Sequence, residues 1–384
     1  MRAVTVSGYG ADARQIGKDV GSGLREALGA DPDVVLLFCA AEYDAAEVLA
    51  GLYDRLDPGV RVVGCSSCAE INSDEATTGS VTAMGLRLGD VVATVVHASD
   101  PGHDSGAVGR ALGEALAPAR PSLVLLFVDG VHLNSTPVLA GMQAVLGAGM
   151  PIVGGVAADA LTFTRTHEYV DREVLCGAAV ALALAGPLRF ETIVAGGWQA
   201  IGKSRVITRA TDSKTIVELD GEPALDVYRR YLGTFGRDLD NAGLEFPIGV
   251  IAVPGDAIAA DTAFIRAVQG AAPDGRGVRV SGDIVEGATV RMMRASRDEL
   301  IASATRGVQA AVQTLPDPAL ALFFDCAGRK VVLGTRYQEE LAAAFEHLPA
   351  GVPRVGFYTY GELAPRAGTT IHHDETFTAV LIGS

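Results

Sequence analysis

Basic residues are scarce in this chain of 384 residues, which carries 31 Lys and Arg against 46 Asp and Glu and a formal net charge of −15. No basic cluster interleaved with aromatic residues offsets that charge, so nucleic acid is not expected as a partner. Long hydrophobic runs are also missing, because the longest, residues 177–186, is about half of what a bilayer-spanning helix needs. The N-terminal segment lacks the basic start and apolar core of a secretion signal. We therefore expect a cytoplasmic protein without a membrane span.

Cysteines are few and odd in number, unlike the dense even set of a disulfide-stapled secreted domain, which favours reduced thiols. Cys65 and Cys68 form a Cys-x-x-Cys pair, but no second such pair completes a tetrahedral metal site, so structural thiols are favoured over a redox or metal role. The Gly-x-Ser-x-Gly frame of many hydrolases is absent. A dinucleotide fingerprint is present only as a weak match at residues 8–13.

Three segments of the chain repeat one pattern of strand, helix, buried strand ending in Phe, helix, strand ending in Val-Gly, and a last strand. The landmarks are Phe38 and Gly64, Phe127 and Gly154, and Phe324 and Gly356. The glycines are 90 residues apart in the first two copies and 202 apart in the last two, so a long segment is inserted between copies two and three. Its short strand candidates and Gly-, Asp- and Pro-rich turns indicate an antiparallel sheet.

These patterns predict an α/β protein, with mixed sheets built from three βαβαβ-like pseudo-repeats and an inserted, mainly antiparallel β segment. Apolar residues at helical spacing support a helix before each Phe-ending strand. The three expected stripes are Ile16, Val20, Leu24 and Leu28; Val108, Leu112 and Leu116; and Ile301, Ala304, Val308 and Val312. A division into domains 1–219 and 220–384 is expected.

The loops after the Val-Gly strands are the first place to look for a ligand, because α/β sheets bind ligands beyond the carboxyl ends of their strands. A carboxylate follows each glycine by five or six positions, at Glu70, Asp159 and Glu362. These side chains either face a shared pocket and hold a cationic or hydroxyl group, or cap local backbone amides. Trp198, the one tryptophan, is predicted either on a pocket wall or in the core.

Seven segments in this order resemble the FIST family: GCSSCAEI, PIVGGVAADAL, EYVDREVLCGAAVALAL, GGWQAIGKSRVITRA, ELDGEPALDVYRRYLG, GFYTYGELAP and HHDETFTAVLI. The resemblance implies a FIST N-terminal-like domain over residues 1–219 and a FIST C-terminal-like domain over residues 220–384. It also implies a sensory ligand-binding module of bacterial signal transduction, similar to haem-binding, nitric-oxide-sensing members.

The resemblance also implies ligand-binding residues, namely Cys65, Ser66, Gly155, Trp198, Tyr360 and Glu362. The loop comparison adds Glu70 and Asp159 to these candidates. The resemblance implies haem b as a cofactor, and His373 is the candidate axial ligand. Cys68 and the Asp-Glu pair after His373 depart from the family pattern.

Two alternatives stay open beside the haem sensor. The first is a sensor of a small metabolite, such as an amino acid, without haem. The second is an enzyme that uses the Cys65 thiol with the loop carboxylates, although the sequence lacks a base–nucleophile signature and a non-enzymatic role is expected. The expected partners are a small-molecule ligand and a separate histidine kinase, diguanylate cyclase or phosphodiesterase, with a homodimer among the expected assemblies.

Overall fold

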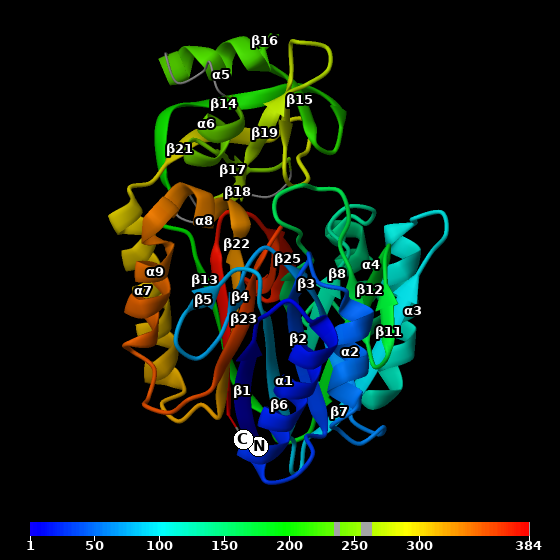
Figure 1. Cartoon of the computed structure of the whole chain (residues 1–384). Helices are drawn as coiled ribbons and strands as arrows, with labels where there is room; N and C mark the ends of the chain where they lie inside the picture. The colour runs from blue at the N-terminus through cyan, green and yellow to red at the C-terminus, as the bar shows by residue number, and fades with distance from the viewer. Residues whose placement is uncertain (234–238, 255–262, 384) are drawn as a thin grey trace.

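The computed structural model describes residues 1–233, 239–254 and 263–383. These residues form three mixed sheets and one antiparallel sheet, and helices cover the outer faces of the mixed sheets (Figure 1). The predicted α/β class is confirmed. Within the described ranges, no helix combines the length and the apolarity needed to cross a membrane.

The first mixed sheet belongs to the first repeat. Its strands, in order, are β1 (Arg2–Gly8), β6 (Val81–Arg87), β2 (Val34–Ala40), β3 (Arg61–Ser67), β10 (Glu168–Val170) and β11 (Glu173–Leu175). Strands β2 and β3 run parallel, and their neighbours run antiparallel to them. Helices α1 (Ala13–Leu28) and α2 (Ala45–Tyr53) connect and cover these strands.

The second and third mixed sheets repeat this order. The second contains β25 (Thr369–His373), β24 (Glu362–Arg366), β9 (Ile152–Val156), β8 (Leu123–Val128), β12 (Ala178–Ala185) and β7 (Val92–Ser99), covered by α3 (Ser105–Leu116) and α4 (Ser135–Leu146). The third contains β13 (Arg189–Ala195), β26 (Phe377–Gly383), β22 (Leu320–Cys326), β23 (Arg354–Thr359), β4 (Glu70–Ile71) and β5 (Ala76–Thr77), covered by α7 (Arg297–Thr314) and α9 (Tyr337–Phe345).

Each repeat contributes a hairpin to the sheet of another repeat. Hairpin β4–β5 of the first repeat pairs with β23, hairpin β10–β11 of the second pairs with β3, and hairpin β24–β25 of the third pairs with β9. The exchange is cyclic, so the three sheets close into a ring around one axis. This interlocking makes each repeat depend on the other two.

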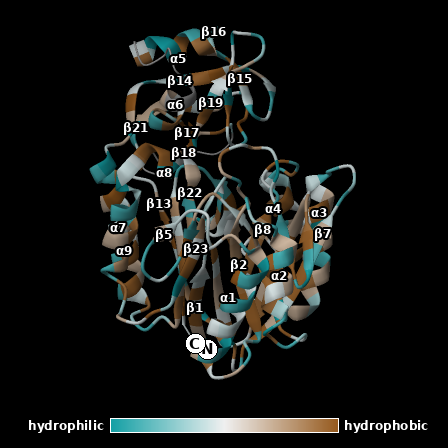
Figure 2. Cartoon of the chain, viewed as in Figure 1, coloured by the Kyte–Doolittle hydropathy of each residue, from teal (hydrophilic) through white to brown (hydrophobic). Residues whose placement is uncertain are grey.

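The Phe-ending strands meet in the centre of that ring. Alternate side chains of β2, β8 and β22 share one core, and Phe38 and Phe127 lie with ring centroids 5.5 Å apart. Phe324 lies 6.2 Å from Phe127, so the equivalent residues of all three repeats pack together. The other face of each strand packs against its own helices. Figure 2 shows the resulting concentration of hydrophobic residues along the strands.

The repeated Val-Gly sequence has a steric cause. A Cβ atom on Gly64, Gly154 or Gly356 would lie 1.8–2.0 Å from a carbonyl oxygen of the neighbouring parallel strand. No side chain fits such a close approach of backbones, so glycine is required at all three positions.

The inserted segment forms the antiparallel sheet, as predicted. Its strands, in order, are β18 (Phe264–Arg266), β17 (Ile248–Ala252), β21 (Thr289–Arg294), β14 (Gln199–Asp212), β15 (Thr215–Leu219), β20 (Val278–Val280) and β19 (Val268–Ala271), with β16 (Glu222–Pro223) beside β15. Helices α5 (Ala224–Leu232) and α6 (Leu239–Glu245) belong to the same segment. The unit lies over the end of the ring at which β22 terminates and α8 (Ala327–Leu333) begins (Figure 1).

The expected division at residue 220 stays a prediction: residue 220 lies in the turn between β15 and β16 of the antiparallel sheet, which begins with β14. One expected helix stripe needs adjustment. In α7 the buried stripe is Leu300, Ala304, Val308 and Ala311, whereas Ile301 and Val312 are half-buried. The stripes of α1 and α3 are buried as predicted.

Candidate functional site

A cavity of about 260 Å³ lies between the antiparallel sheet and the third repeat. The lining residues come from β13 and the turn after it, from the antiparallel sheet, and from the β24–β26 region: Val194, Gly196, Gly197, Trp198, Ala200, Ala263, Ile265, Met293, Arg366 and Thr376. Cavities between structural units are common ligand sites, because both units can contribute contacts.

The wall around Trp198 is held in place by hydrogen bonds. The indole Nε1 donates to the carbonyl oxygen of Glu375 at 2.8 Å, so the ring keeps a fixed orientation beside the cavity. The carbonyl of Gly196 accepts a hydrogen bond from the Arg329 guanidinium at 2.5 Å. A polar scaffold behind the wall therefore fixes the Gly-Gly-Trp turn.

The lining also carries a cation and a hydroxyl group, from Arg366 and Thr376. The guanidinium of Arg366 lies 5.3 Å from the ring centroid of Phe264 and 3.4 Å from the carbonyl oxygen of Ala263. Thr376 donates its hydroxyl and its backbone N–H to Oε2 of Glu362, at 2.7 and 3.1 Å. Oε1 of Glu362 has no hydrogen-bond partner among the described residues. The cavity thus has a positive group on its lining and a buried carboxyl group directly behind the lining.

More carboxyl groups lie deeper in the third repeat. Asp325, Glu340 and Glu375 are fully buried, and Arg329 is the buried cation among them. Arg329 contacts Glu340 at 2.6 Å, whereas both carboxyl oxygens of Glu375 lack a partner in the described part of the chain. Burial raises the pKa of Glu375 to about 8, with a further contribution from the neighbouring Asp374. Burial also raises the pKa of Glu362.

Asp159 and Tyr360 lie in the loops at the end of the ring axis and do not line the cavity. Asp159 accepts hydrogen bonds from the backbone N–H groups of Thr162, Phe163 and Thr164 at 2.9 Å, and the Tyr360 hydroxyl also donates to it. Although burial alone would raise its pKa, these hydrogen bonds lower the pKa of Asp159. For Asp159, the structure therefore matches the interpretation that the carboxylate caps local backbone.

The structure changes the comparison of the three loop carboxylates. Glu70 pairs with Phe357, and Glu362 pairs with Gly155. Phe357 and Gly155 each directly follow the glycine of a Val-Gly strand, so the two glutamates occupy equivalent positions. In the second repeat this position belongs to Glu168, opposite Cys65, and not to Asp159. Glu168 is fully buried, and neither of its carboxyl oxygens has a hydrogen-bond partner of normal geometry within the described ranges.

The carboxyl group of Glu70 finds its hydrogen-bond partners within its own repeat. It accepts hydrogen bonds from the Ser67 hydroxyl at 2.5 Å and from the backbone and hydroxyl of Ser80 at 3.0 and 2.7 Å. Burial raises its pKa to about 7, although these hydrogen bonds oppose the shift. Ser80 in the first repeat and Thr376 in the third repeat bind the equivalent glutamate in the same way.

The remaining loop residues have structural roles. Cys65 packs in the central core, and burial raises the pKa of its thiol, which makes it a poor nucleophile. Ser66 exchanges backbone and side-chain hydrogen bonds with His167. A Cβ atom on Gly155 would lie 2.7 Å from Oγ1 of Thr359, so this glycine permits close packing. The carboxyl group opposite Cys65 in the sheet is that of Glu168, which is not one of the three loop carboxylates compared in the sequence.

His373 does not fit the role of a haem ligand. Its side chain is 3% exposed, its Nε2 lies 3.2 Å from the carbonyl oxygen of Ala364, and it is not among the residues that line the cavity. Burial lowers its pKa to about 3, so the ring is neutral at physiological pH. Coordination of iron by this residue would require the β24–β25 hairpin to open.

Sequence reasoning therefore found part of the cavity and missed the rest. Trp198 lines the cavity, and Glu362 lies directly behind it through Thr376. Arg366 was missed, although it stands four residues after Glu362 in the same strand and thus was within reach of a search of that strand. Glu375 was missed as a buried acid, although its departure from the family pattern was visible.

Comparison with known proteins gives the family. The FIST N domain model matches residues 33–222, and the FIST C domain model matches residues 224–365. The chain is similar to the uncharacterized protein Rv0628c of Mycobacterium tuberculosis, with 27% identity over 383 residues, and 96% of each chain is covered. It is also similar to the uncharacterized protein Mb0898c of Mycobacterium bovis, with 28% identity over 386 residues and 96% of each chain covered.

Among solved structures, a cyanuric acid hydrolase from A. caulinodans aligns over 100% of this chain and 99% of its own. The sequence identity is 8% and the TM-score is 0.40. This likeness is too weak to support a statement about fold or function.

Proposed function

The chain belongs to the FIST family of signalling sensory domains, and we propose that it binds a small metabolite carrying both an anionic and a cationic group, such as an amino acid, beside Trp198. The observation that carries this proposal is the cavity between the two structural units. Its volume of about 260 Å³ lies below the roughly 300–1,000 Å³ typical of sites for drug-sized ligands, which favours a small ligand.

The charges around the cavity support a ligand with groups of both signs. Arg366 places a guanidinium on the lining of the cavity, and the pairing of a guanidinium with a carboxylate is strong and directional. Behind Thr376 lies the buried carboxyl group of Glu362, whose Oε1 has no hydrogen-bond partner in the described residues. An ammonium group in the cavity would favour the ionised form of this carboxyl group. Trp198 supplies a fixed aromatic face for the apolar part of the ligand.

The position of the cavity supports a sensory role. A ligand that contacts both the antiparallel sheet and the third repeat favours the relative position of the two units in which both sets of contacts form. Occupancy would then change the surface offered to a separate histidine kinase or cyclic-di-GMP enzyme. Because His373 is enclosed in its hairpin, the proposal does not include haem.

Calorimetric titration of the full chain with the twenty L-amino acids tests this proposal. We expect at least one of them to bind, and we expect the corresponding amine and the corresponding carboxylic acid, each lacking one charged group, to bind more weakly. Arg366→Gln should weaken binding by roughly tenfold or more, because a charge-assisted hydrogen bond contributes about 1.5–3 kcal/mol. Trp198→Ala should also weaken it.

The matched control is Arg189→Gln, which removes an exposed guanidinium on β13 that pairs with Asp317. This variant should bind like the unmodified chain. The proposal is overturned if no amino acid binds, or if Arg366→Gln and Arg189→Gln behave alike. A Soret band at one haem per chain after incubation with haem would replace it with the haem-sensor alternative.

A further inference from the structure

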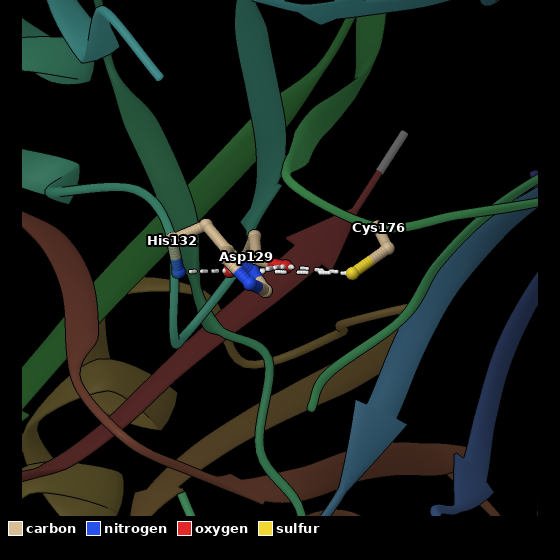
Figure 3. A group of neighbouring side chains, drawn as sticks. All are labelled: Asp129, His132 and Cys176. Carbon is tan, nitrogen blue, oxygen red and sulfur yellow. Dashed lines mark hydrogen bonds and ion pairs between the residues drawn. The ribbon is translucent and has the colours of Figure 1, made fainter. Parts of the chain in front are cut away.

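A second group of chemically active side chains lies at the carboxyl end of β8, in the second repeat. Asp129 directly follows β8, His132 lies three residues further along, and Cys176 stands two residues before β12, the strand that pairs with β8. Figure 3 shows the three side chains directed toward one another from these separate segments.

The separations of the donor atoms match those of a metal site. Nδ1 of His132 lies 3.4 Å from Oδ2 of Asp129, and Sγ of Cys176 lies 3.9 Å from each of these two atoms. With Zn²⁺ bond lengths of about 2.0–2.3 Å, donor atoms of a tetrahedral site lie about 3.3–3.6 Å apart. Inward movements of a few tenths of an ångström would therefore complete the coordination of one ion.

The carboxylate is fixed before any ion arrives. The backbone N–H groups of Val131 and His132 donate to its Oδ1 at 2.8 and 2.5 Å, and that of Gly177 donates to its Oδ2 at 2.8 Å. Asp129 is fully buried, whereas the His132 side chain is 35% exposed and Cys176 is exposed. Such support around a ligand is typical of metal sites, and the exposure of the other two donors gives an ion access.

The orientation of the histidine ring is fixed too. The ring of His103 stacks on that of His132, with centroids 5.2 Å apart and planes inclined by 25°. The packed ring keeps Nδ1 directed toward Asp129 and Cys176, so little conformational entropy is lost when it coordinates an ion.

We propose that Asp129, His132 and Cys176 form a zinc site with three protein ligands and a fourth position open to solvent. A thiolate combined with an imidazole favours Zn²⁺ over Mg²⁺ and Ca²⁺, which prefer oxygen ligands. Three protein ligands and one open position are typical of zinc sites that bind water or an exogenous ligand. The site is separate from the cavity beside Trp198, because the residues that line that cavity include none of the three ligands.

Cobalt substitution tests the proposal on the full chain. The protein, with its thiols reduced, is stripped with a chelator, dialysed and titrated with Co²⁺. We expect one equivalent to produce a sulfur-to-cobalt charge-transfer band in the near ultraviolet together with the visible bands of tetrahedral Co²⁺. Addition of Zn²⁺ should abolish these bands. Competition with a chromophoric chelator then gives the Zn²⁺ affinity.

Two variants remove a ligand without touching the buried carboxylate. Cys176→Ser should abolish the charge-transfer band. Both Cys176→Ser and His132→Gln remove a direct ligand, so each should weaken Zn²⁺ binding by more than the roughly 10–100-fold that loss of an outer-shell partner costs. The matched controls are Cys68→Ser, at a thiol in another loop, and His347→Gln, at a half-buried histidine that contacts Gln309. Both controls should retain the band and the affinity.

Several outcomes would overturn the zinc site. One is the absence of any Co²⁺ spectrum, and another is a spectrum without a sulfur band, which would indicate adventitious surface binding only. A charge-transfer band that persists in Cys176→Ser, or that is lost equally in Cys68→Ser, would assign the metal to a different thiol.

Discussion

At the scale of single residues, the third repeat buries more carboxyl groups than cations that could pair with them. Glu375 is the clearest case, because it is fully buried and both of its carboxyl oxygens lack partners in the described residues. Its folded-state pKa is raised to about 8 from an ordinary 4.5. Between these two pH values the folded chain keeps a proton that the unfolded chain has released. Stability therefore falls as the pH rises through this window.

Replacing this side chain with a neutral amide gives a measurable consequence. Between pH 5 and pH 8, the free energy of unfolding of the unmodified chain should fall more steeply with pH than that of Glu375→Gln. The two slopes should differ by up to about 1.4 kcal/mol per pH unit. Urea unfolding at pH 5, 6, 7 and 8 measures the two slopes. Glu339→Gln, at an exposed glutamate, should follow the unmodified chain. Equal slopes for Glu375→Gln and the unmodified chain would contradict the buried protonated carboxyl group.

Asp159 provides the opposite case, a carboxylate saturated with donors. In Asp159→Asn an NH₂ group replaces one of the two acceptor oxygens. This group cannot accept hydrogen bonds from the N–H and hydroxyl groups of the loop at residues 162–165. We expect a loss of about 2–4 kcal/mol in the free energy of unfolding at pH 7, measured with urea. We also expect faster amide exchange in this loop.

Ligand binding separates this structural role from a direct role in a site. Because Asp159 is not among the residues that line the cavity, Asp159→Asn should leave any amino acid affinity of the folded protein unchanged. The exposed Asp317→Asn serves as the stability control. A stability loss below about 0.5 kcal/mol would show that the capping of this loop is dispensable.

Residue spacing was sufficient to locate the loops but not to align them. Glu70 and Glu362 both stand six positions after their glycine, whereas Glu168 stands fourteen positions after Gly154. The longer second loop places Asp159 at the expected spacing, where it caps its own loop. The zinc ligands were out of reach for a related reason: Cys176 approaches Asp129 only through the pairing of β8 with β12.

At the scale of elements, the two helices of the first repeat, and likewise those of the second, pack through glycine. A Cβ atom on Gly109 of α3 would lie 2.0 Å from the carbonyl oxygen of Val138 in α4. Gly17 of α1 makes the equivalent approach to Val48 of α2. Since the contacts involve backbone atoms on both sides, a methyl group can be accommodated only if the helices move apart.

Gly109→Ala should therefore lower the free energy of unfolding by about 1–3 kcal/mol, which is the usual cost of overpacking. Gly106→Ala is the matched control on the same helix, because its Cβ atom would meet only side-chain atoms, at 3.3 Å or more. That variant should be neutral or slightly stabilising, as alanine favours the helix. Chemical unfolding of both variants measures the difference, and equal effects would show that the close helix contact has no energetic importance.

Elements with strong periodicity were predictable, and short ones were not. The apolar strands and the helices beside them follow from hydrophobic pattern. In the structure, Ser296 caps α7 and accepts a hydrogen bond from the Glu299 backbone at 3.1 Å. The exchange of hairpins could not be predicted, because strands such as β4 and β5 have only two residues each. So short a sequence does not indicate which strand it pairs with. The ring closure therefore emerges from pairing between repeats.

At the scale of the whole molecule, a chain of buried polar contacts joins the antiparallel sheet to the ring. Arg266 of β18 contacts Asp374 at 3.1 Å, and Asp374 lies 3.2 Å from Nε2 of His372. Nδ1 of His372 lies 2.7 Å from the hydroxyl of Ser135, at the start of α4. Although burial opposes ionisation, the nearby His372 and Arg266 lower the pKa of Asp374 to about 2, so the carboxylate is ionised at physiological pH.

Breaking this connection should loosen the contact between the two units on which the proposed ligand-driven response would depend. Arg266→Met leaves the buried carboxylate of Asp374 without its guanidinium, and such a loss costs about 3–5 kcal/mol. We expect faster hydrogen exchange in β18 and at the start of α4, together with weaker binding of any ligand in the cavity, because Ile265, the neighbour of Arg266, lines it. Arg279→Met, at an exposed arginine of β20, is the matched control and should change neither property. If both variants exchange at the same rate as the unmodified chain, the antiparallel sheet is held by its apolar contacts, and a sensory response would have to act through those contacts instead.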